Sequence, residues 1–231
     1  MTNIAKIIDQ TFLKKEAGED EVKKIAKEAR EYNFRGFCVL PAHVKWAKEI
    51  LSGSDVKVTT LIDEPTGASL HQKRIKMCKK AENEGSDELD VVMKIDAFKN
   101  GKYDEVLNDL KEICKILPTK VIIGSGYLTD EEIKKASAIT RESGAICVKT
   151  ATINDPLDGA ELPEKAKHVK IMRELAPELL VKAAGSIRTL ADLKMMIEAG
   201  ADIIGTSSGA EIVNEAEGKN ISYSQFWRKA E

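Results

Sequence analysis

The sequence lacks the features that mark disulfide-rich, metal-binding and membrane proteins. Its four cysteines (Cys38, Cys78, Cys114 and Cys147) lie far apart and form no CxxC pair, so zinc ribbons and CxxC redox motifs are excluded. No segment approaches the roughly 18 apolar residues of a membrane helix, and the N-terminal segment MTNIAKIIDQT has no apolar stretch of signal-peptide length. We therefore predict a cytoplasmic protein with no membrane partner.

The chain also lacks a strong net charge. Its 36 Lys and Arg residues nearly balance 38 Asp and Glu residues, which leaves a formal charge of −2 and no electrostatic reason to expect nucleic acid as a partner. The three histidines, His43, His71 and His168, show no metal-ligand spacing and fall in or beside charged helical segments, so we expect them at the surface or its boundary. We predict no metal site and no cofactor.

What the chain does have is a regular alternation of short apolar runs and amphipathic charged segments. Eight runs predict buried parallel strands: 5–9, 36–40, 56–62, 88–93, 120–123, 145–150, 179–183 and 202–205. Seven clear helical segments lie between them: 20–32, 41–51, 70–84, 103–117, 129–143, 165–175 and 189–199. The runs are spaced roughly 21–34 residues apart, as repeated strand–helix units require. We predict an α/β protein with a single-domain (β/α)8 TIM barrel.

Local signals support these boundaries. Thr129 and Thr189 are predicted helix N-caps, and Gly144 and Gly200 follow helices where a left-handed residue is favoured. The alternative fold, an open doubly wound sheet, lacks support because no GxGxxG follows the first strand. We assign 1–213 to the barrel. We expect 214–231, with Phe226 and Trp227, to form a tail that packs on the barrel or at a subunit contact of a homodimer or homotetramer.

Two lysines at the ends of neighbouring strands are the strongest chemical signal. Lys149 closes the run Ala145–Lys149 and Lys182 closes Leu179–Lys182, although charged groups are costly in buried strands. A second ammonium close by, together with partial burial, makes a lysine easier to deprotonate, and a neutral amine can attack a carbonyl. The alternative is that one or both lysines bind an anion at the barrel mouth or extend to solvent.

Carboxylates and glycine-rich turns complete the candidate site. Asp90, within an apolar strand, is either a proton shuttle for the lysines or half of a structural salt bridge, and Asp9 raises the same question. The turns Gly185-Ser-Ile-Arg188 and Gly205-Thr-Ser-Ser-Gly209 follow the last two strands, where barrels often bind phosphate through backbone N–H groups.

Together these residues resemble the deoxyribose-phosphate aldolase family, class I aldolases of (β/α)8 fold. The matching stretches run in the family's order: Ile8-Asp-Gln-Thr11, Cys38-Val-Leu-Pro41, Asp87–Val92, Val148-Lys-Thr-Ala-Thr152, Val181–Gly185 with Ile187-Arg-Thr189, and Gly205–Gly209. The resemblance implies reversible cleavage of 2-deoxy-D-ribose 5-phosphate to acetaldehyde and D-glyceraldehyde 3-phosphate.

The resemblance also implies residue roles. Lys149 would form the Schiff base, Lys182 would perturb it, and Asp90 would relay protons with an ordered water. Substrate-binding positions are implied for Asp9, Cys38, Thr152, Gly185, Arg188, Gly205, Ser207 and Ser208.

The chain departs from the family's usual pattern at several pocket positions. Ile153 and Ser186 stand where the family usually has glycine, Asp63 and Glu64 replace Gly-Phe after the third strand, and Gly124-Ser125 replaces Glu-Thr after the fifth. Related Schiff-base chemistry on a different or unphosphorylated aldehyde acceptor is therefore the second hypothesis. A non-catalytic barrel that binds a sugar phosphate or a protein, and an unrelated phosphate-binding barrel isomerase, are further alternatives.

Overall fold

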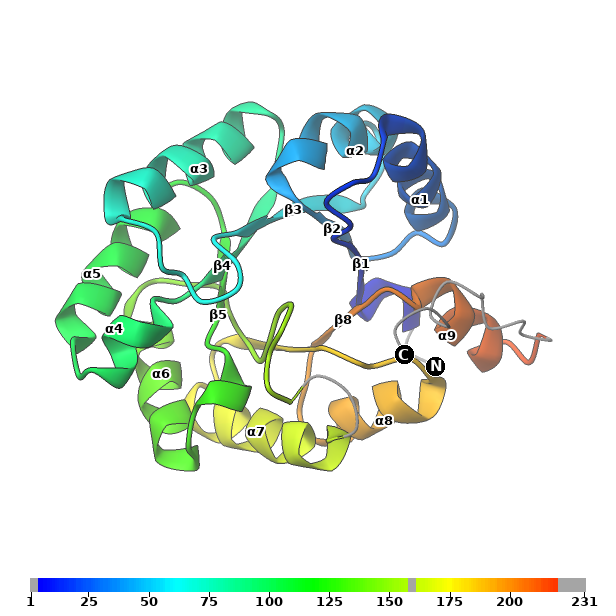
Figure 1. Ribbon diagram of the computed structural model, residues 1–231. Helices are drawn as coiled ribbons and strands as arrows, with labels where there is room; N and C mark the ends of the chain where they lie inside the picture. The colour runs from blue at the N-terminus through cyan, green and yellow to red at the C-terminus, as the bar shows by residue number, and fades with distance from the viewer. Residues whose placement is uncertain (1–3, 158–160, 220–231) are drawn as a thin grey trace.

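The protein forms a closed barrel of eight parallel strands, confirming the predicted architecture. The computed structural model describes residues 4–157 and 161–219. Each strand pairs with its sequence neighbours, and the first pairs with the last, so the ring has no open edge (Figure 1). The strands are β1 (Ile8–Phe12), β2 (Gly36–Val39), β3 (Lys57–Ile62), β4 (Glu88–Val92), β5 (Thr119–Ile122), β6 (Cys147–Lys149), β7 (Leu180–Ala184) and β8 (Ile203–Thr206).

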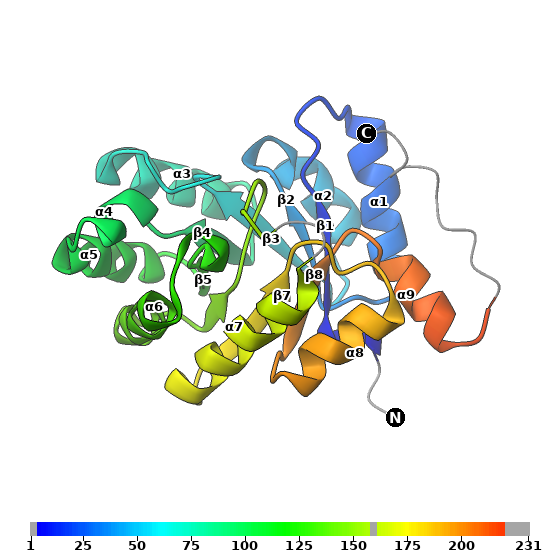
Figure 2. The same ribbon diagram turned by 60° about the horizontal axis from the view of Figure 1, so that its bottom comes forward.

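Helices surround this ring, as the two views show (Figures 1 and 2). They are α1 (Glu19–Glu31), α2 (Val44–Leu51), α3 (His71–Asn83), α4 (Ile95–Lys99), α5 (Tyr103–Cys114), α6 (Asp130–Glu142), α7 (Leu162–Leu175), α8 (Leu190–Glu198) and α9 (Gly209–Ala216). Short 3-10 helices cover Ile4–Ile7, Pro41–His43 and Ser125–Tyr127. Among the described residues, no helix is long and apolar enough to cross a membrane.

The strands are buried on both faces, which explains their continuous apolar runs. All residues of β2, β4, β5, β6 and β8 are buried. The outward-facing side chains pack against the apolar stripes of the helices in one extended core. Polar side chains that lie in these strands are therefore forced into the barrel interior or against the helices.

Several boundaries differ from those expected. The expected first strand, 5–9, starts too early: Ile4–Ile7 form a 3-10 helix and β1 begins at Ile8. The sequence also gave no sign of α4, which is only five residues long. The helix α9 runs past position 213, where we placed the end of the barrel, and most of the expected tail, 220–231 with Phe226 and Trp227, lies outside the described residues.

The predicted helix ends are confirmed. Thr129 and Thr189 each form a capping box, in which the threonine hydroxyl accepts from the backbone N–H three residues on. The side chains of Glu132 and Asp192 accept in turn from the two cap residues. Gly144 and Gly200 have φ of 82° and 106°, the left-handed conformation expected after a helix. The two capping boxes fix where the chain leaves the loops after β5 and β7 and enters α6 and α8.

Candidate active site

The two lysines singled out in the sequence lie side by side. In the parallel pairing of β6 and β7, Lys149 is the register partner of Lys182. Lys149 is the last residue of β6, as expected. The prediction for Lys182 was partly wrong, because β7 continues to Ala184 and places Lys182 in mid-strand, fully buried inside the barrel. The barrel therefore offers one amine near its rim and a second one deeper.

A single carboxylate oxygen joins the two amines. Lys149 Nζ lies 2.6 Å from Asp90 Oδ2, and Lys182 Nζ lies 2.9 Å from the same atom. Asp90 is the third residue of β4, fully buried, so it reaches the amines across the interior of the barrel. A carboxylate in this place accepts a charge-assisted hydrogen bond from each amine and couples the two.

Further charges extend this group into what we call the charged cluster. It comprises Asp9, Arg35, Glu88, Asp90, Lys120, Lys149 and Lys182. Asp9 Oδ2 accepts from Lys182 Nζ at 2.6 Å. Lys120 Nζ lies 3.0 Å from Asp90 Oδ1 and 2.5 Å from Glu88 Oε2. Arg35 binds Glu88 through both terminal nitrogens, at 2.9 and 3.0 Å, and also donates to Asp9 Oδ1 at 2.9 Å.

The cluster keeps its carboxylates ionised. Burial alone would raise the pKa of Asp90, but Lys120, Lys149 and Lys182 hold it well below its ordinary value. Burial would also raise the pKa values of Asp9 and Glu88. Lys182, Lys120 and Arg35 lower that of Asp9 instead, and Lys120 and Arg35 lower that of Glu88.

The two deeper lysines are held in their charged form. Burial would lower the pKa of Lys182, but Asp9 and Asp90 raise it above its ordinary value. Burial would also lower the pKa of Lys120, but Asp90 and Asp9 raise it above its ordinary value. Neither amine is then available as a neutral nucleophile, and both lie farther from the rim than Lys149.

With every group ionised, the cluster holds one positive charge in excess. Its four cations are Arg35, Lys120, Lys149 and Lys182, and its three carboxylates are Asp9, Glu88 and Asp90. Buried uncompensated charge is costly, so release of one proton by the cluster is favoured. Lys149 touches only an oxygen that Lys182 shares, whereas Lys182 contacts two carboxylates and Lys120 contacts three.

Two glycines make room for these side chains. A Cβ on Gly36 would lie 2.7 Å from Asp9 Oδ1, and a Cβ on Gly205 would lie 3.0 Å from Lys182 Cε. A Cβ on Gly205 would also lie 3.0 Å from Ala184 Cβ, and the approach of Gly205 to a phosphate stays a prediction. The absence of a side chain at both positions is thus part of how the cluster fits inside eight strands.

Cys38 and Thr152 lie close to the lysines, in space or in sequence. Cys38 Sγ is 3.8 Å from Asp90 Oδ2, and burial together with the Asp90 charge raises the pKa of its thiol to about 11, so it stays protonated. Thr152, three residues beyond Lys149, has a buried Oγ1 with no hydrogen-bond partner within the described chain. A bound oxygen atom could satisfy this hydroxyl.

The turns after β7 and β8 are already partly bonded within the protein. Ser208 N donates to Thr206 Oγ1, Gly209 N donates to Gln10 Oε1, and Ser207 O accepts from Gln10 Nε2. After β7, Gly185 has φ of 95° and Arg188 is exposed. The fully buried Lys165 of α7 donates to Gly185 O at 2.7 Å and brings a cation to this turn.

Sequence reasoning missed Arg35, Glu88, Lys120 and Lys165. Arg35 and Lys120 stand at the start of strands, where a basic residue usually faces solvent, and Lys165 begins a segment that looks like an amphipathic surface helix. Glu88 was visible as an acid inside a buried run, and this signal, the same one that identified Asp90, could have found it.

The expectation for the histidines was wrong for two of the three. His43 and His168 are buried, at 2% and 4% exposure, and burial lowers the pKa of both. His43 stacks on Trp46, with ring centroids 5.7 Å apart. Only His71 is partly exposed, where its Nδ1 lies 2.8 Å from Asp109 Oδ1. Aromatic and helix packing, which the sequence did not reveal, accounts for the burial of His43 and His168.

One group of side chains has the composition of a metal site. Ligand-capable atoms of Asp130, Glu164 and His168 lie within 4.8 Å of one another. The Lys167 ammonium, however, lies 2.8 Å from Asp130 Oδ2 and 3.1 Å from Glu164 Oε1, and so already supplies the positive charge. We assign no metal to this group.

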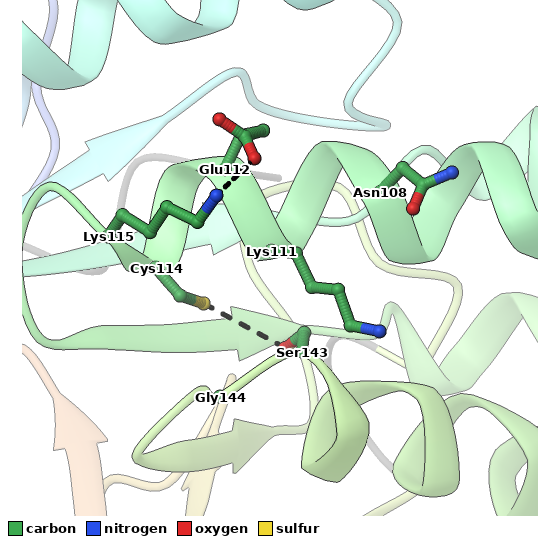
Figure 3. A pocket seen from close by; sticks show the side chains of 7 residues that line it. All are labelled: Asn108, Lys111, Glu112, Cys114, Lys115, Ser143 and Gly144. Atoms are coloured by element: carbon green, nitrogen blue, oxygen red, sulfur yellow. Dashed lines mark hydrogen bonds and ion pairs between the residues drawn. The ribbon is translucent and has the colours of Figure 1, made fainter.

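A surface hollow of about 440 Å³ lies between the C-terminal parts of α5 and α6 (Figure 3). Its lining includes Cys114, Ser143 and Gly144, which precede strands β5 and β6. It therefore opens at the N-terminal end of the barrel, away from Lys149. Catalytic groups of barrels gather at the opposite end, so this hollow is separate from the candidate active site.

The deoxyribose-phosphate aldolase of Caldanaerobacter subterraneus subsp. tengcongensis is 42% identical over 222 residues, 93% of this chain and 94% of the relative. This chain belongs to the deoxyribose-phosphate aldolase family. No family model matches the chain. The solved structure of "QR15, an Aldolase" is 38% identical, with a TM-score of 0.87 over 94% of this chain and 97% of that one. A tetrameric deoxyribose phosphate aldolase from Aeropyrum pernix is 27% identical, with a TM-score of 0.84 over 93% of this chain and 91% of that one.

Membership of this family makes the protein an aldolase, a carbon–carbon lyase. The structure shows how it accommodates the residues that depart from the family pattern. Ser186, in a position that is usually glycine, has φ of 58°, so the backbone keeps the left-handed conformation at some cost. Ile153 is half-buried and packs against the main core. Asp63 accepts from Arg74 at 2.6 Å, and Glu64 lies 3.0 Å from Lys15 Nζ. Both acids therefore have cationic partners.

Proposed function

We propose that this aldolase cleaves 2-deoxy-D-ribose 5-phosphate reversibly to acetaldehyde and D-glyceraldehyde 3-phosphate through a Schiff base on Lys149. The observation that carries the proposal is the shared oxygen: Lys149 and Lys182 both contact Asp90 Oδ2, at 2.6 and 2.9 Å. On this proposal Lys149 is the nucleophilic amine near the rim, Lys182 is the deeper ammonium that retains its proton, and Asp90 is the carboxylate between them.

The proposed reaction begins on the open-chain aldehyde. The neutral Lys149 amine adds to C1, and the carbinolamine so formed takes up a proton and loses water to give a protonated imine. A base removes the proton of the C3 hydroxyl, the C2–C3 bond breaks, and its electrons move towards the iminium nitrogen. Glyceraldehyde 3-phosphate leaves, the remaining enamine takes up a proton at C2, and water hydrolyses the imine to acetaldehyde and free Lys149.

We assign the proton transfers to Asp90 and the charge tuning to Lys182. Asp90, with an ordered water, would carry protons between the substrate hydroxyl and the cluster. Asp9 would hold Lys182 in place through its ion pair with the Lys182 ammonium at 2.6 Å. Cys38 would border the aldehyde site as a neutral thiol beside Asp90, and the unpartnered hydroxyl of Thr152 would bind a substrate oxygen.

The phosphate would lie over the turns after β7 and β8. We assign Gly185, Arg188, Gly205, Ser207 and Ser208 to this subsite, with the buried Lys165 beside Gly185 as an added positive charge. The internal bonds of Ser208 N and Gly209 N leave fewer free backbone donors there than a phosphate cradle usually offers. This favours keeping an unphosphorylated acceptor as the second candidate.

Two measurements test these alternatives. A retro-aldol assay compares deoxyribose 5-phosphate with free deoxyribose, and a kcat/KM at least about tenfold higher for the phosphate ester is expected from one charged contact. Borohydride reduction in the presence of substrate should attach the acetaldehyde fragment to Lys149, located by mass spectrometry. No trapped lysine in an active enzyme would exclude the Schiff base, and equal kcat/KM values would favour the unphosphorylated acceptor.

The proposal extends to assembly and location. The tetramer named for the Aeropyrum pernix relative supports a homo-oligomer, which analytical ultracentrifugation can measure directly. A cytoplasmic location remains our prediction.

A further inference from the structure

The charged cluster continues below the reacting groups to an ion pair at the N-terminal end of the barrel. Arg35 immediately precedes β2, and Glu88 is the first residue of β4. We propose that Arg35 and Glu88 are positioning residues that set how readily the cluster gives up a proton from Lys149. This inference rests on the proposed function, because it concerns the protonation of the Lys149 nucleophile.

The geometry connects this pair to Lys149 by two routes. In the first, Arg35 donates to Asp9, Asp9 accepts from Lys182, and Lys182 shares Asp90 Oδ2 with Lys149. In the second, Glu88 accepts from Lys120, which donates to the other oxygen of Asp90. Each intermediate group is fully buried or nearly so, and solvent screening along both routes is weak.

Charge balance gives the two residues opposite effects. With Arg35 present, the cluster has one excess positive charge, and loss of a proton neutralises it. Without Arg35, three lysines face three carboxylates, and Lys149 is favoured to keep its proton. Without the Glu88 charge, the excess rises to two, and proton loss is favoured further.

The other groups that face the cluster do not change this balance. Cys38 on β2 and Cys147 on β6 are buried thiols with pKa raised to about 11 and about 12, so both stay neutral. Lys57 at the start of β3 reaches Glu88 Oε1 at 3.4 Å, but its side chain is 50% exposed and is screened by solvent.

The test is the pH dependence of kcat/KM, whose acidic limb reports the free enzyme's essential amine. Arg35→Met should move its midpoint to higher pH, and Glu88→Gln should move it to lower pH. Each shift should be on the order of 1 pH unit, the effect of a charge roughly 10 Å away at an effective dielectric constant near 20. The double variant R35M/E88Q restores the excess of one charge and should return the midpoint to near the wild-type value.

Lys57→Met is the matched control. Like Arg35→Met, it removes a cation that contacts the Glu88 carboxylate, but the Lys57 side chain is screened by solvent. It should therefore shift the midpoint of the pH profile far less. Arg35→Lys should keep the wild-type midpoint. If either single variant does not fold, as judged by circular dichroism, the other single variant and the double variant give the same comparison. Midpoints that stay in place, or that move in the same direction in both single variants, would overturn the inference while the wild-type enzyme remains active. A wild-type enzyme without aldol cleavage would instead overturn the proposed function.

Discussion

At the scale of single residues, the charged cluster is costly to bury, and its positive and negative charges do not balance. A purely structural salt-bridge network would be expected to balance its charges, because an unpaired buried ion is strongly destabilising. Here four cations face three carboxylates, and the least restrained amine is the one nearest the rim. This imbalance is the physical argument for a reactive Lys149 over the alternative of a structural ion pair.

Gly205→Ala tests how closely the cluster is packed. The added methyl group would lie 3.0 Å from Lys182 Cε and 3.0 Å from Ala184 Cβ, so Lys182 has to shift. We expect kcat/KM to fall roughly tenfold to hundredfold and stability to fall by about 1–3 kcal/mol.

Gly18→Ala is the control for that experiment. Gly18 has φ of −80°, and no atom lies within 4 Å of its added Cβ. Activity should stay at the wild-type level. If Gly205→Ala is as active as Gly18→Ala, Lys182 does not need its present position for catalysis.

At the scale of elements, the loops above the barrel depend on helix ends that the sequence specifies. The α6 capping box ties Thr129 and Glu132 together, and Glu132 also binds Lys99 at 2.8 Å, so one carboxylate joins α6 to the end of α4. The start of α6 thereby fixes where the β5 loop returns to the outer layer.

Thr129→Ala should remove one N-cap bond. We expect the free energy of unfolding to fall by about 1 kcal/mol, measured by urea denaturation. Thr129→Ser keeps the cap hydroxyl and should retain most of that stability. A loss of equal size in both variants would indicate that the threonine methyl group, rather than the cap, stabilises the helix.

Element-scale patterns also show why the sequence predicted the fold so well. Apolar runs, capping residues and helix-ending glycines are local, and each acts within a few residues of itself. The errors arose where local signals are weakest: the five-residue helix α4, and the 3-10 helix Ile4–Ile7, whose Ile-Ala-Lys-Ile sequence looks like a strand.

At the scale of the whole molecule, the buried charges predict how stability depends on pH. Asp9, Glu88 and Asp90 have pKa values lowered in the folded protein, so the stability they contribute is present above the unfolded value and is lost as pH falls through about 4 and below. Lys120 and Lys182 have raised pKa values, and their contribution is lost as pH rises above about 10.5.

Burial of His43 and His168 adds a milder acid effect. Burial lowers both pKa values, so below about pH 6.5 the unfolded chain binds protons that the folded protein does not. Urea unfolding between about pH 2 and pH 11 should show a plateau from about 6.5 to 10, a shallow decline from there to about 4, and a steep loss of stability below about 4.

His43→Phe should reduce the shallow decline, because a phenyl ring can take the stacking position on Trp46 without titrating. An unchanged decline in this variant would show that burial of His43 is not its cause.

The sequence by itself determined the eight strands, most of the helices, and the presence of Lys149, Lys182 and Asp90 on buried strands, because periodicity and buried charge are readable locally. Only the tertiary structure decided that two amines meet one oxygen of Asp90, and that Arg35, Glu88 and Lys120 complete the cluster. These contacts join residues 26 to 173 positions apart. They depend on strand register and on closure of β1 against β8, which place side chains opposite one another across the barrel in ways that no local pattern encodes.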